Sequence, residues 1–402
     1  LVVDNIDHAI AIARKYRHSI RMVTLEGESL SPGGSMTGGA FKNNSNLLGR
    51  RREIEELESS VKALKKDMDD MQKSINDNRS KRNVIRDTIA DLQEKYQKRA
   101  KEEWPEATIY AEGAELLEKE QLDAVHICVP SYKHAELAIQ AMNKGIDVLV
   151  EKPACLKEED CERMLAAKEA NHVSVMVGQV VRFFPEYRYL REAYKNQTFG
   201  KLKSLSMQRL SGNVTWGYED WFHDEEKSGS VVLDLHIHDL DFLRYTFGDP
   251  KEMSCTATAY ASGMVNQIIT NYTFDGVDAP VSAEGLWAES SALPFCPRFY
   301  AQFEQADVVF DGREKPDTLK VYHADGTVEK PDVKEAFSLE GGMQGLNIST
   351  FGPYYTEIQY FYQCRKEGKN PDIASLEEGL ASVKYALKEW KLAKKYGEEK
   401  KS

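Results

Sequence analysis

Apolar residues between Arg50 and Gln97 recur in alternating steps of three and four, in a stretch without glycine, proline or cysteine. Of thirteen consecutive positions with this spacing, eleven are apolar or aromatic. We call these positions the seam: Ile54, Leu57, Val61, Leu64, Met68, Met71, Ile75, Asn78, Arg82, Ile85, Ile89, Leu92 and Tyr96. A heptad pattern sustained over six heptads predicts a coiled-coil helix over 49–97, in preference to a long helix lying on a globular core.

After residue 98 the pattern changes to short apolar runs that alternate with helical segments. The runs have the length and composition of buried parallel strands, and the segments between them have the apolar spacing of helices. The expected strands are 123–130, 146–153 and 173–178, and the expected helices are 131–145 and 155–171. This order predicts an α/β domain over 98–180 with a parallel sheet and right-handed crossovers.

Beyond residue 200 long segments alternate between apolar and polar residues, which is the pattern of strands with one covered face. The expected strands are 252–262, 266–274, 281–289, 298–310 and 318–323. Helices are expected near 354–367 and 375–396. We therefore predict an α+β domain over 181–402 with a mostly antiparallel sheet and C-terminal helices.

The stretch SPGGSMTGGAF, residues 31–41, is the densest glycine run near the start of the chain. Its spacing fits neither the G-x-G-x-x-G loop of dinucleotide sites nor the G-x-x-x-x-G-K-[ST] phosphate-binding loop, the P-loop. The residues themselves therefore predict a tight turn in which two backbones approach closely.

Charge, cysteine content and hydropathy argue against a nucleic-acid-binding, a disulfide-bonded or a membrane-spanning protein. The net charge is −12, divided into +2 for residues 1–97 and −14 for the remainder, so direct nucleic-acid binding is not expected. The six cysteines form no C-x-x-C pair and suit a reducing compartment. No apolar run reaches 18 residues and no signal peptide is visible, which predicts a cytoplasmic protein without a membrane span.

Two short stretches carry candidate chemistry. In VEKPA, residues 150–154, Lys152 stands at a strand end between a carboxylate and a proline, where it could orient a hydroxyl group; an ordinary surface strand end is the alternative. In VVLDLHIHDLDF, residues 231–242, Asp234 and His238 share a face if the segment is helical. A carboxylate beside an imidazole suits a general base.

Two other interpretations of residues 231–242 stay open from the residues alone. A metal site could use the H-x-H pair His236 and His238 with an aspartate, but that spacing brings the two rings together only on a strand. His238 could also be a structural histidine behind an aspartate at a helix start.

Residues 1 to about 97 resemble the second half of the hinge domain, with its returning coiled coil, of structural-maintenance-of-chromosomes (SMC) ATPases. The segments that carry this resemblance are RMVTLEG (21–27), PGGSMTGG (32–39) and RRREIEEL (50–57). It implies a hinge-like half domain over 1–48, a dimer-contact role for the glycines, and a hinge or coiled-coil partner. The ATPase head motifs of that family are absent from the sequence.

Residues from about 98 to 398 resemble the Gfo/Idh/MocA oxidoreductases. The resemblance rests on the stretches 129–156 with the EKP triplet, 178–205, 228–250 and 354–383. It implies NAD or NADP as cofactor, a sugar or polyol substrate, and a homo-oligomer formed through the C-terminal sheet. It assigns catalysis to Lys152, Asp234 and His238, and no metal. It places Pro130, His134, Glu151, Pro153 and Arg182 on the cofactor side.

Members of the oxidoreductase family begin with a strand, a G-x-G-x-x-G loop and a helix, and nothing of this kind precedes residue 123. The two resemblances meet near residues 94–113, and the chain starts at Leu1 as if cut. We therefore expect a chimeric chain with an incomplete Rossmann-type sheet. Its expected function is hydride transfer between a sugar or polyol hydroxyl and NAD(P), with weak or no activity; the alternative is an SMC-like dimerisation protein of chromosome organisation.

Overall fold

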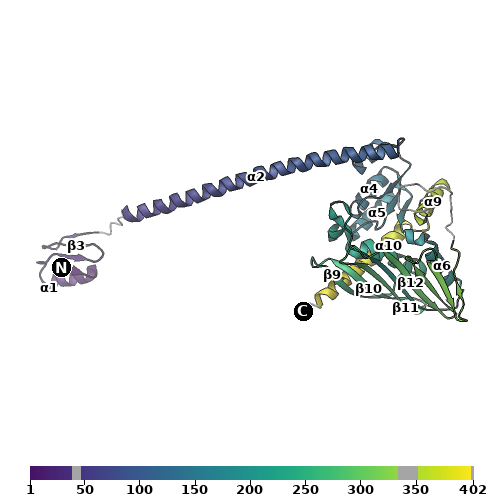
Figure 1. Cartoon of the computed structure of the whole chain (residues 1–402). Coiled ribbons are helices and arrows are strands. Elements are labelled where there is room, and N and C mark those ends of the chain that lie inside the picture. Colours follow the sequence, from purple (N-terminus) through teal and green to yellow (C-terminus); the bar gives the residue numbers. More distant parts are fainter. Residues whose placement is uncertain (39–46, 334–351, 400–402) are drawn as a thin grey trace. The chain divides into compact units, whose positions relative to one another are not determined.

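The computed structural model describes residues 1–38, 47–333 and 352–399. The chain divides into two compact units, Leu1–Ile109 and Tyr110–Ser402. Each unit is described by itself below, with the labels of Figure 1.

Unit 1 begins with a small sheet and one helix. The helix α1 spans Ile6–Lys15 and starts at Asn5, whose side chain accepts a hydrogen bond from the backbone N–H of His8. The sheet has the order β1-β2-β3-β4. Its strands are β1 (Val2–Val3), β2 (Met22–Thr24), β3 (Ser29–Leu30) and β4 (Met36–Thr37). A small core of Ala9, Ala13, Met22 and Leu30 holds these elements together.

Two glycines of the run, Gly33 and Gly34, lie in the turn between β3 and β4, and Gly38 follows β4. Gly33 and Gly34 have φ angles of 99° and 86°, which a residue with a side chain rarely adopts. A Cβ atom on Gly38 would lie 2.8 Å from the Cα atom of Glu28. The prediction of a tight turn with closely approaching backbones is therefore confirmed, except at Gly39, which lies outside the described residues.

The long helix of unit 1, α2, spans Leu47–Glu103, six residues further than the predicted end at 97. Its seam is open to solvent in this single chain: Leu64 is 66% exposed and Met68 is 69% exposed. The helix is thus present as the heptad pattern requires, whereas its pairing with a second helix stays a prediction.

Unit 2 contains the predicted three-stranded parallel sheet, in the order β5-β6-β7. Its strands are β5 (Ala124–Ile127), β6 (Asp147–Glu151) and β7 (Val175–Gly178), joined by α4 (His134–Asn143) and α5 (Glu158–Asn171). Ile127, Val148 and Val150 belong to a buried core with residues of α4 and α5. Within the described sheet β5 pairs on one side only, with β6, and is therefore an edge strand.

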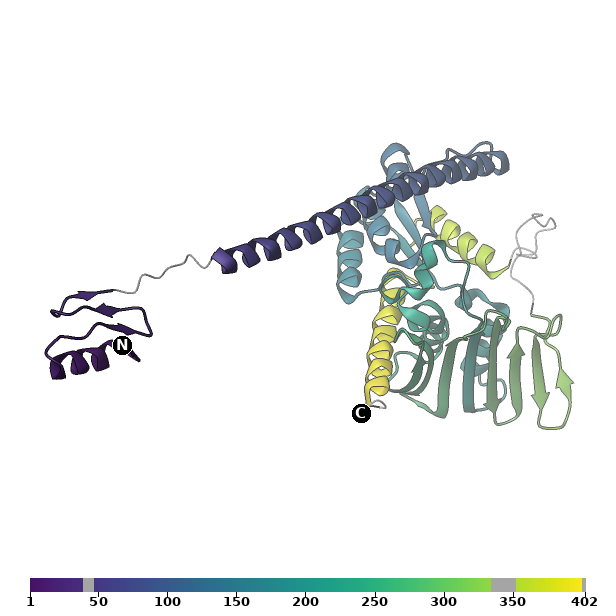
Figure 2. The same cartoon turned by 60° about the vertical axis from the view of Figure 1, so that its left-hand side comes forward.

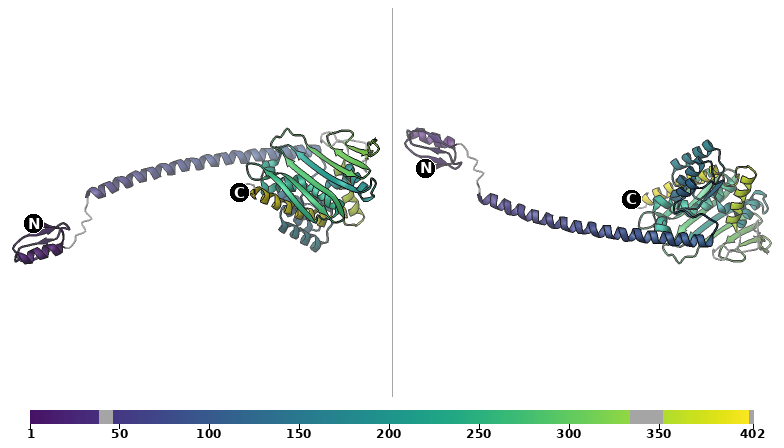
Figure 3. Two further views of the ribbon diagram at one scale, coloured as in Figure 1. Left: turned by 90° about the horizontal axis from the view of Figure 1, so that it is seen from below. Right: turned by 90° about the horizontal axis from the view of Figure 1, so that it is seen from above.

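A second sheet of unit 2 has eight strands in the order β15-β14-β13-β12-β8-β11-β10-β9. All neighbours are antiparallel except β8 and β11, which run parallel. Helices cover one face of this sheet (Figures 1 and 2), and the strands lie in front of them in the left view of Figure 3. The strands are β8 (Leu202–Ser211), β9 (Glu252–Ala259), β10 (Val265–Phe274), β11 (Val277–Trp287), β12 (Cys296–Phe303), β13 (Ala306–Asp311), β14 (Leu319–His323) and β15 (Val328–Glu329).

Two strand predictions need correction. The segment 298–310, expected as one strand, is a hairpin in which β12 and β13 meet at Glu304 and Gln305. Strand β8 was not predicted, although it lies in the middle of the sheet between β12 and β11. Its inward residues include Arg209, a charged residue that interrupts the apolar alternation.

The remaining elements connect or cover the two sheets. They are α3 (Gly113–Lys119), η1 (Ser131–Lys133), η2 (Val180–Phe183), α6 (Pro185–Lys195), η3 (Tyr218–His223), α7 (Glu225–Ser228), η4 (Val232–His236), α8 (Ile237–Phe247), α9 (Pro353–Lys366) and α10 (Leu376–Glu399). None of the described helices is long and apolar enough to cross a membrane.

Helix α8 is fixed by two buried ion pairs. Arg182 of η2 donates two hydrogen bonds of 2.8 Å to Asp241, and both side chains are 1% exposed. Arg209 of β8 donates to both carboxylate oxygens of Asp239, at 3.1 and 2.7 Å. Each pair joins α8 to a different element, so the charges place this helix as well as the apolar contacts do.

We expect Asp241→Asn to lower the free energy of unfolding by about 3 kcal/mol, because it removes the buried bidentate partner of the Arg182 guanidinium and leaves it only the half-exposed Glu378, 3.4 Å away. Urea denaturation followed by circular dichroism measures the change. The control is Asp275→Asn, which removes an exposed partner of Lys251 and should cost less than about 0.5 kcal/mol. Equal losses in the two variants would contradict the structural role of the buried pair.

Candidate active site

A cavity of about 470 Å³ opens at the carboxyl ends of β5 and β6, where open parallel sheets bind ligands. Its wall combines residues from these strand ends with residues of η4, the eight-stranded sheet and the segment around η3. The lining residues are Cys128, Val129, His134, Glu151, Lys152, Ser211, Val214, Trp216, Trp221, Phe222, Asp234, Leu235, Trp287 and Phe295.

Lys152 and Asp234, 82 residues apart in sequence, meet in this cavity. The ammonium group of Lys152 donates to the backbone carbonyl of Asp234 at 2.6 Å and to its carboxylate at 3.1 Å. The side chains are 16% and 15% exposed, so the pair is largely withdrawn from water but open to the cavity. A lysine held by two acceptors has a fixed position and one direction left for a ligand.

Asp234 is positioned by a π-helical turn, η4, that leads into α8. Such turns are rare and frequently occur at functional sites. Two features bring η4 close to the sheet. Gly229, with φ 71°, allows the chain to turn into the helix. At Gly285 of β11 a Cβ atom would lie 2.8 Å from the Cβ atom of His236, so only glycine leaves the necessary space.

His238 lies one turn after Asp234 and is not among the residues that line the cavity. Its Nδ1 atom is buried without a hydrogen-bond partner in the described part of the chain. Burial, together with the charges of Lys152 and Arg209, holds the pKa of His238 well below its ordinary value. The imidazole is therefore neutral at neutral pH and has a nitrogen able to accept a proton.

The expected pairing of Asp234 with His238 is corrected by these contacts. The carboxylate of Asp234 binds the ammonium group of Lys152, which is a stronger partner than a neutral imidazole. His236 is not among the residues that line the cavity. Its Nε2 atom lies 3.0 Å from the hydroxyl oxygen of Tyr272 and 3.3 Å from a carboxylate oxygen of Glu389, which favours a structural role over a metal ligand.

Among the residues expected on the cofactor side, His134 and Glu151 line the cavity beside Lys152. The ring nitrogens of His134 lie 2.8 Å from the carbonyl oxygen of Pro153 and 2.7 Å from that of Val129. Burial lowers the pKa of His134, so a neutral ring donates one of these bonds. His134 thus lies against the loops after both β5 and β6 and donates a hydrogen bond to one of them. Pro130 caps η1 and is not part of the cavity wall.

Arg182 does not join this group. It is committed to the buried pair with Asp241 and lines a separate cavity of about 480 Å³ with Tyr245 and Thr356. Its expected contact with the cofactor stays a prediction, since Arg182 is not among the residues that line the cavity with Lys152.

The aromatic part of the wall was missed by the sequence analysis. Trp216, Trp221 and Phe222 come from one stretch, and Trp221 stacks on Phe222 with ring centroids 3.9 Å apart. Trp287 at the end of β11 closes the wall from the sheet. The cluster of aromatic residues in WGYEDWF, 216–222, was the available signal.

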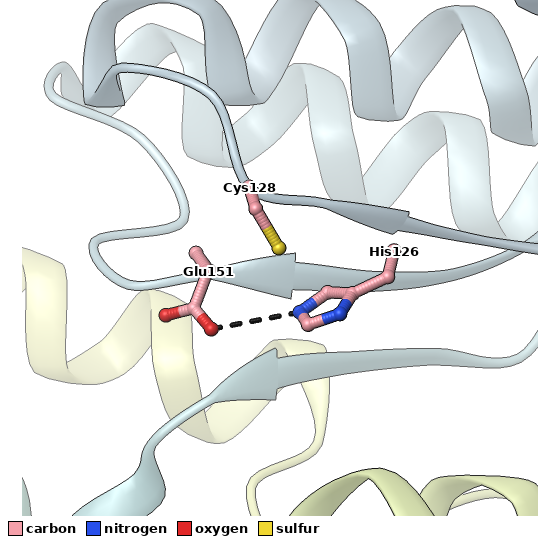
Figure 4. Close-up of side chains that lie close together, drawn as sticks. All are labelled: His126, Cys128 and Glu151. Carbon is pink, nitrogen blue, oxygen red and sulfur yellow. Dashed lines mark ion pairs between the residues drawn. The ribbon is translucent and has the colours of Figure 1, made fainter. Parts of the chain in front are cut away.

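A cluster of three possible metal-ligand side chains lies at the same strand ends (Figure 4). The sequence analysis predicted no metal site. His126, Cys128 and Glu151 each offer one ligand atom, and these atoms lie within 4.8 Å of one another. Burial opposes protonation of His126, but Cys128 and Glu151 outweigh it and raise the pKa of the imidazole to about 10.

Comparison with protein families matches two parts of the chain. Residues 69–179 match the oxidoreductase family with an NAD-binding Rossmann fold, and residues 187–290 match the GFO/IDH/MocA C-terminal domain. The first match begins inside α2, before the predicted boundary at 98. The chain therefore carries the NAD-binding and C-terminal domains of Gfo/Idh/MocA oxidoreductases. The resemblance of residues 1–97 to SMC proteins stays a prediction.

Characterised relatives differ in how much of them the chain covers. A 2,7-anhydro-N-acetylneuraminate hydratase of Mediterraneibacter gnavus is 31% identical over 142 residues, which is 35% of this chain and 38% of that protein. A myo-inositol 2-dehydrogenase of Thermotoga maritima is 27% identical over 323 residues, 78% of this chain and 89% of that protein. The chain thus spans less than half of the first relative and most of the second.

The fold has solved counterparts. A levoglucosan dehydrogenase in complex with NADH and levoglucosan superposes with a TM-score of 0.64 at 18% identity, over 75% of this chain and 86% of that one. At this identity the likeness concerns the fold: a parallel Rossmann-like sheet followed by an antiparallel sheet domain.

We expect Lys152→Met to raise the pKa of His238, because it removes the positive charge that has the larger of the two electrostatic effects against protonation of the ring. Carbon-detected titration of the histidine rings by NMR measures this, with the His238 resonance assigned by its loss in His238→Gln. Lys168→Met, which removes a lysine paired with Glu377, is the control and should leave the pKa of His238 unchanged. No difference between the two lysine variants would show that Lys152 does not act on His238.

Proposed function

We propose that this chain, which carries the NAD-binding and C-terminal domains of the Gfo/Idh/MocA oxidoreductases, transfers a hydride between a sugar or polyol hydroxyl and NAD or NADP. The observation that carries the proposal is the contact of Lys152 with Asp234 in a cavity at the strand ends, one helical turn from the neutral His238.

The residues divide the chemistry between them. Lys152 is held with its ammonium group at the cavity, where it can donate to the hydroxyl oxygen of a substrate and stabilise negative charge that develops there. His238, whose imidazole is neutral and lies one helical turn after Asp234, is the group we assign to take the hydroxyl proton. Asp234 acts on Lys152 as a positioning residue. The nicotinamide supplies hydride transfer when it is bound.

The cavity fits the reacting end of the cofactor better than its phosphates. Tryptophan and phenylalanine rings offer flat apolar surface for a nicotinamide or a sugar ring. In the described residues, however, no glycine-rich turn leads from a strand of the parallel sheet into a helix N-terminus, the usual pyrophosphate site. We expect the loss of several charge-assisted hydrogen bonds, each worth roughly 1.5–3 kcal/mol, to leave cofactor affinity no better than about millimolar.

We include in the proposal that the chain forms a homo-oligomer and is located in the cytoplasm. The exposed face of the eight-stranded sheet is the surface we assign to a homo-oligomer, since its strands expose alternate side chains such as Ile269 and Tyr300. A cytoplasmic location agrees with six cysteines that are all free thiols.

The test is reduction of NAD⁺ or NADP⁺, each supplied at several millimolar, with inositols, anhydrosugars and aldoses as candidate substrates. We expect slow formation of the reduced cofactor at 340 nm, and a fall in kcat/KM of about 10²- to 10⁴-fold in Lys152→Met and in His238→Gln. Asp234→Asn should lower kcat less, because it loosens Lys152 without removing it.

The control is Lys133→Met, a lysine on η1 outside the cavity wall, which should keep the parent activity. Activity that survives in both Lys152→Met and His238→Gln would place the reaction elsewhere. A dissociation constant in the micromolar range would show that another segment supplies the phosphate site.

A second candidate function belongs to unit 1. We propose that α2 and the small hinge-like sheet form a dimerisation module of the SMC type, which would make the chain chimeric. The supporting observation is the exposed seam: Leu64, Met68 and Met71 lie on one side of the helix and are each 66–69% exposed. An apolar row of this length is stabilised when it is buried against a second helix.

A peptide of residues 50–96 should therefore be weakly helical at low micromolar concentration and gain helicity as it self-associates, which circular dichroism and sedimentation equilibrium measure together. Met68→Glu should abolish the association because it places a charge in the seam. Lys66→Glu, two residues earlier and outside the seam, is the matched control. Full helicity of a monomer at every concentration would argue against the coiled coil.

A further inference from the structure

Three potential metal ligands lie on one face of the parallel sheet. His126 and Cys128 are two residues apart along and just beyond β5, so their side chains point to the same side. The parallel register pairs His126 with Leu149 and Ile127 with Val150, and its continuation places Cys128 beside Glu151. The register thus brings the three side chains together from two strands, as Figure 4 shows.

The geometry is close to that of a bound ion. One ligand atom of each residue lies within 4.8 Å of those of the other two, and the Nε2 atom of His126 is 3.5 Å from a carboxylate oxygen of Glu151. Ligand atoms around a tetrahedral zinc ion lie about 3.3–3.8 Å apart, so small side-chain rotations close the site. The side chains of His126 and Glu151 are 32% and 24% exposed, which leaves a path from solvent.

A neighbouring residue supports the site independently. Glu357 of α9 is 1% exposed, and its Oε1 atom has no hydrogen-bond partner in the described part of the chain. Its carboxyl group lies close enough to Glu151, His126 and Cys128 to interact with them electrostatically. A buried carboxyl without a partner beside this trio is explained if a cation belongs among them.

Gly178 keeps the carboxylate in place. Residue 178 of β7 pairs with Glu151, and a Cβ atom there would lie 3.0 Å from its Oε2 atom. A larger residue would push the carboxylate away from His126, so the absence of a side chain at 178 preserves the grouping.

We propose that His126, Cys128 and Glu151 bind a zinc ion, with a fourth position left for water or for Glu357. An imidazole, a thiolate and a carboxylate together are the ligand types that zinc accepts, whereas magnesium and calcium require oxygen ligands. The site uses two residues of the cavity wall, Cys128 and Glu151, and zinc there lies beside Lys152. The proposal does not depend on hydride transfer, because metal binding is measured without substrate.

The experiment uses the full chain, reduced and stripped of metal. Competition with a chromophoric chelator should show one zinc ion bound at micromolar or tighter affinity. Cobalt(II) in place of zinc should give a thiolate-to-cobalt charge-transfer band in the near ultraviolet. Cys128→Ser should abolish that band, and both Cys128→Ser and His126→Ala should weaken zinc binding at least tenfold.

Two controls separate this site from other candidates. Cys255→Ser removes a half-buried thiol of β9, and His8→Ala removes an exposed histidine paired with Asp4. Neither should change zinc affinity or the cobalt band. Circular dichroism of each variant checks that it folds, and Glu151→Gln offers a third ligand change if one of the others does not. Zinc binding that survives both Cys128→Ser and His126→Ala, or affinity weaker than millimolar in the parent chain, would overturn the proposal.

Discussion

The position of α8 in unit 2 depends on burying two carboxylates without leaving either unpaired. Asp239 and Asp241 are fully buried on this helix, and each is met by a guanidinium group from another element. Removing either arginine would leave an isolated buried charge, which a fold tolerates badly. Because η4 continues directly into α8, the same pairs fix where Asp234 meets Lys152.

The sequence predicts the local elements well and the contacts between them poorly. Apolar runs and helical spacing predicted β5, β6 and β7 and the two helices between them, because each of these patterns depends only on the residues of its own segment. The hairpin at Glu304 and Gln305 was missed because it turns without glycine or asparagine, the usual signals. The bidentate role of Arg182 was missed because its partner lies 59 residues away.

In the candidate site, too, the sequence predicted individual residues but not the contacts between them. Lys152 was found because its triplet belongs to a recognisable family stretch, and His238 because it follows an aspartate at helical spacing. That Asp234 binds Lys152 instead of His238 depends on the approach of η4 to β6, which no local pattern encodes. The grouping of His126 and Cys128 with Glu151 likewise depends on the register of two parallel strands. Because the ligands come from two separate segments, their spacing in the sequence does not predict a metal site.

The burial of His238 also sets how the folded chain responds to acid. An exposed histidine in the unfolded chain takes up a proton near its ordinary pKa of 6.5, whereas the buried ring in the folded chain does so only at much lower pH. Below that ordinary value the unfolded state therefore binds the extra proton, and this one group lowers the free energy of unfolding by up to about 1.4 kcal/mol for each further pH unit until the folded ring is protonated as well. The neutrality that makes His238 a proton acceptor therefore carries a cost in acid, where this one group lowers the stability of the folded chain.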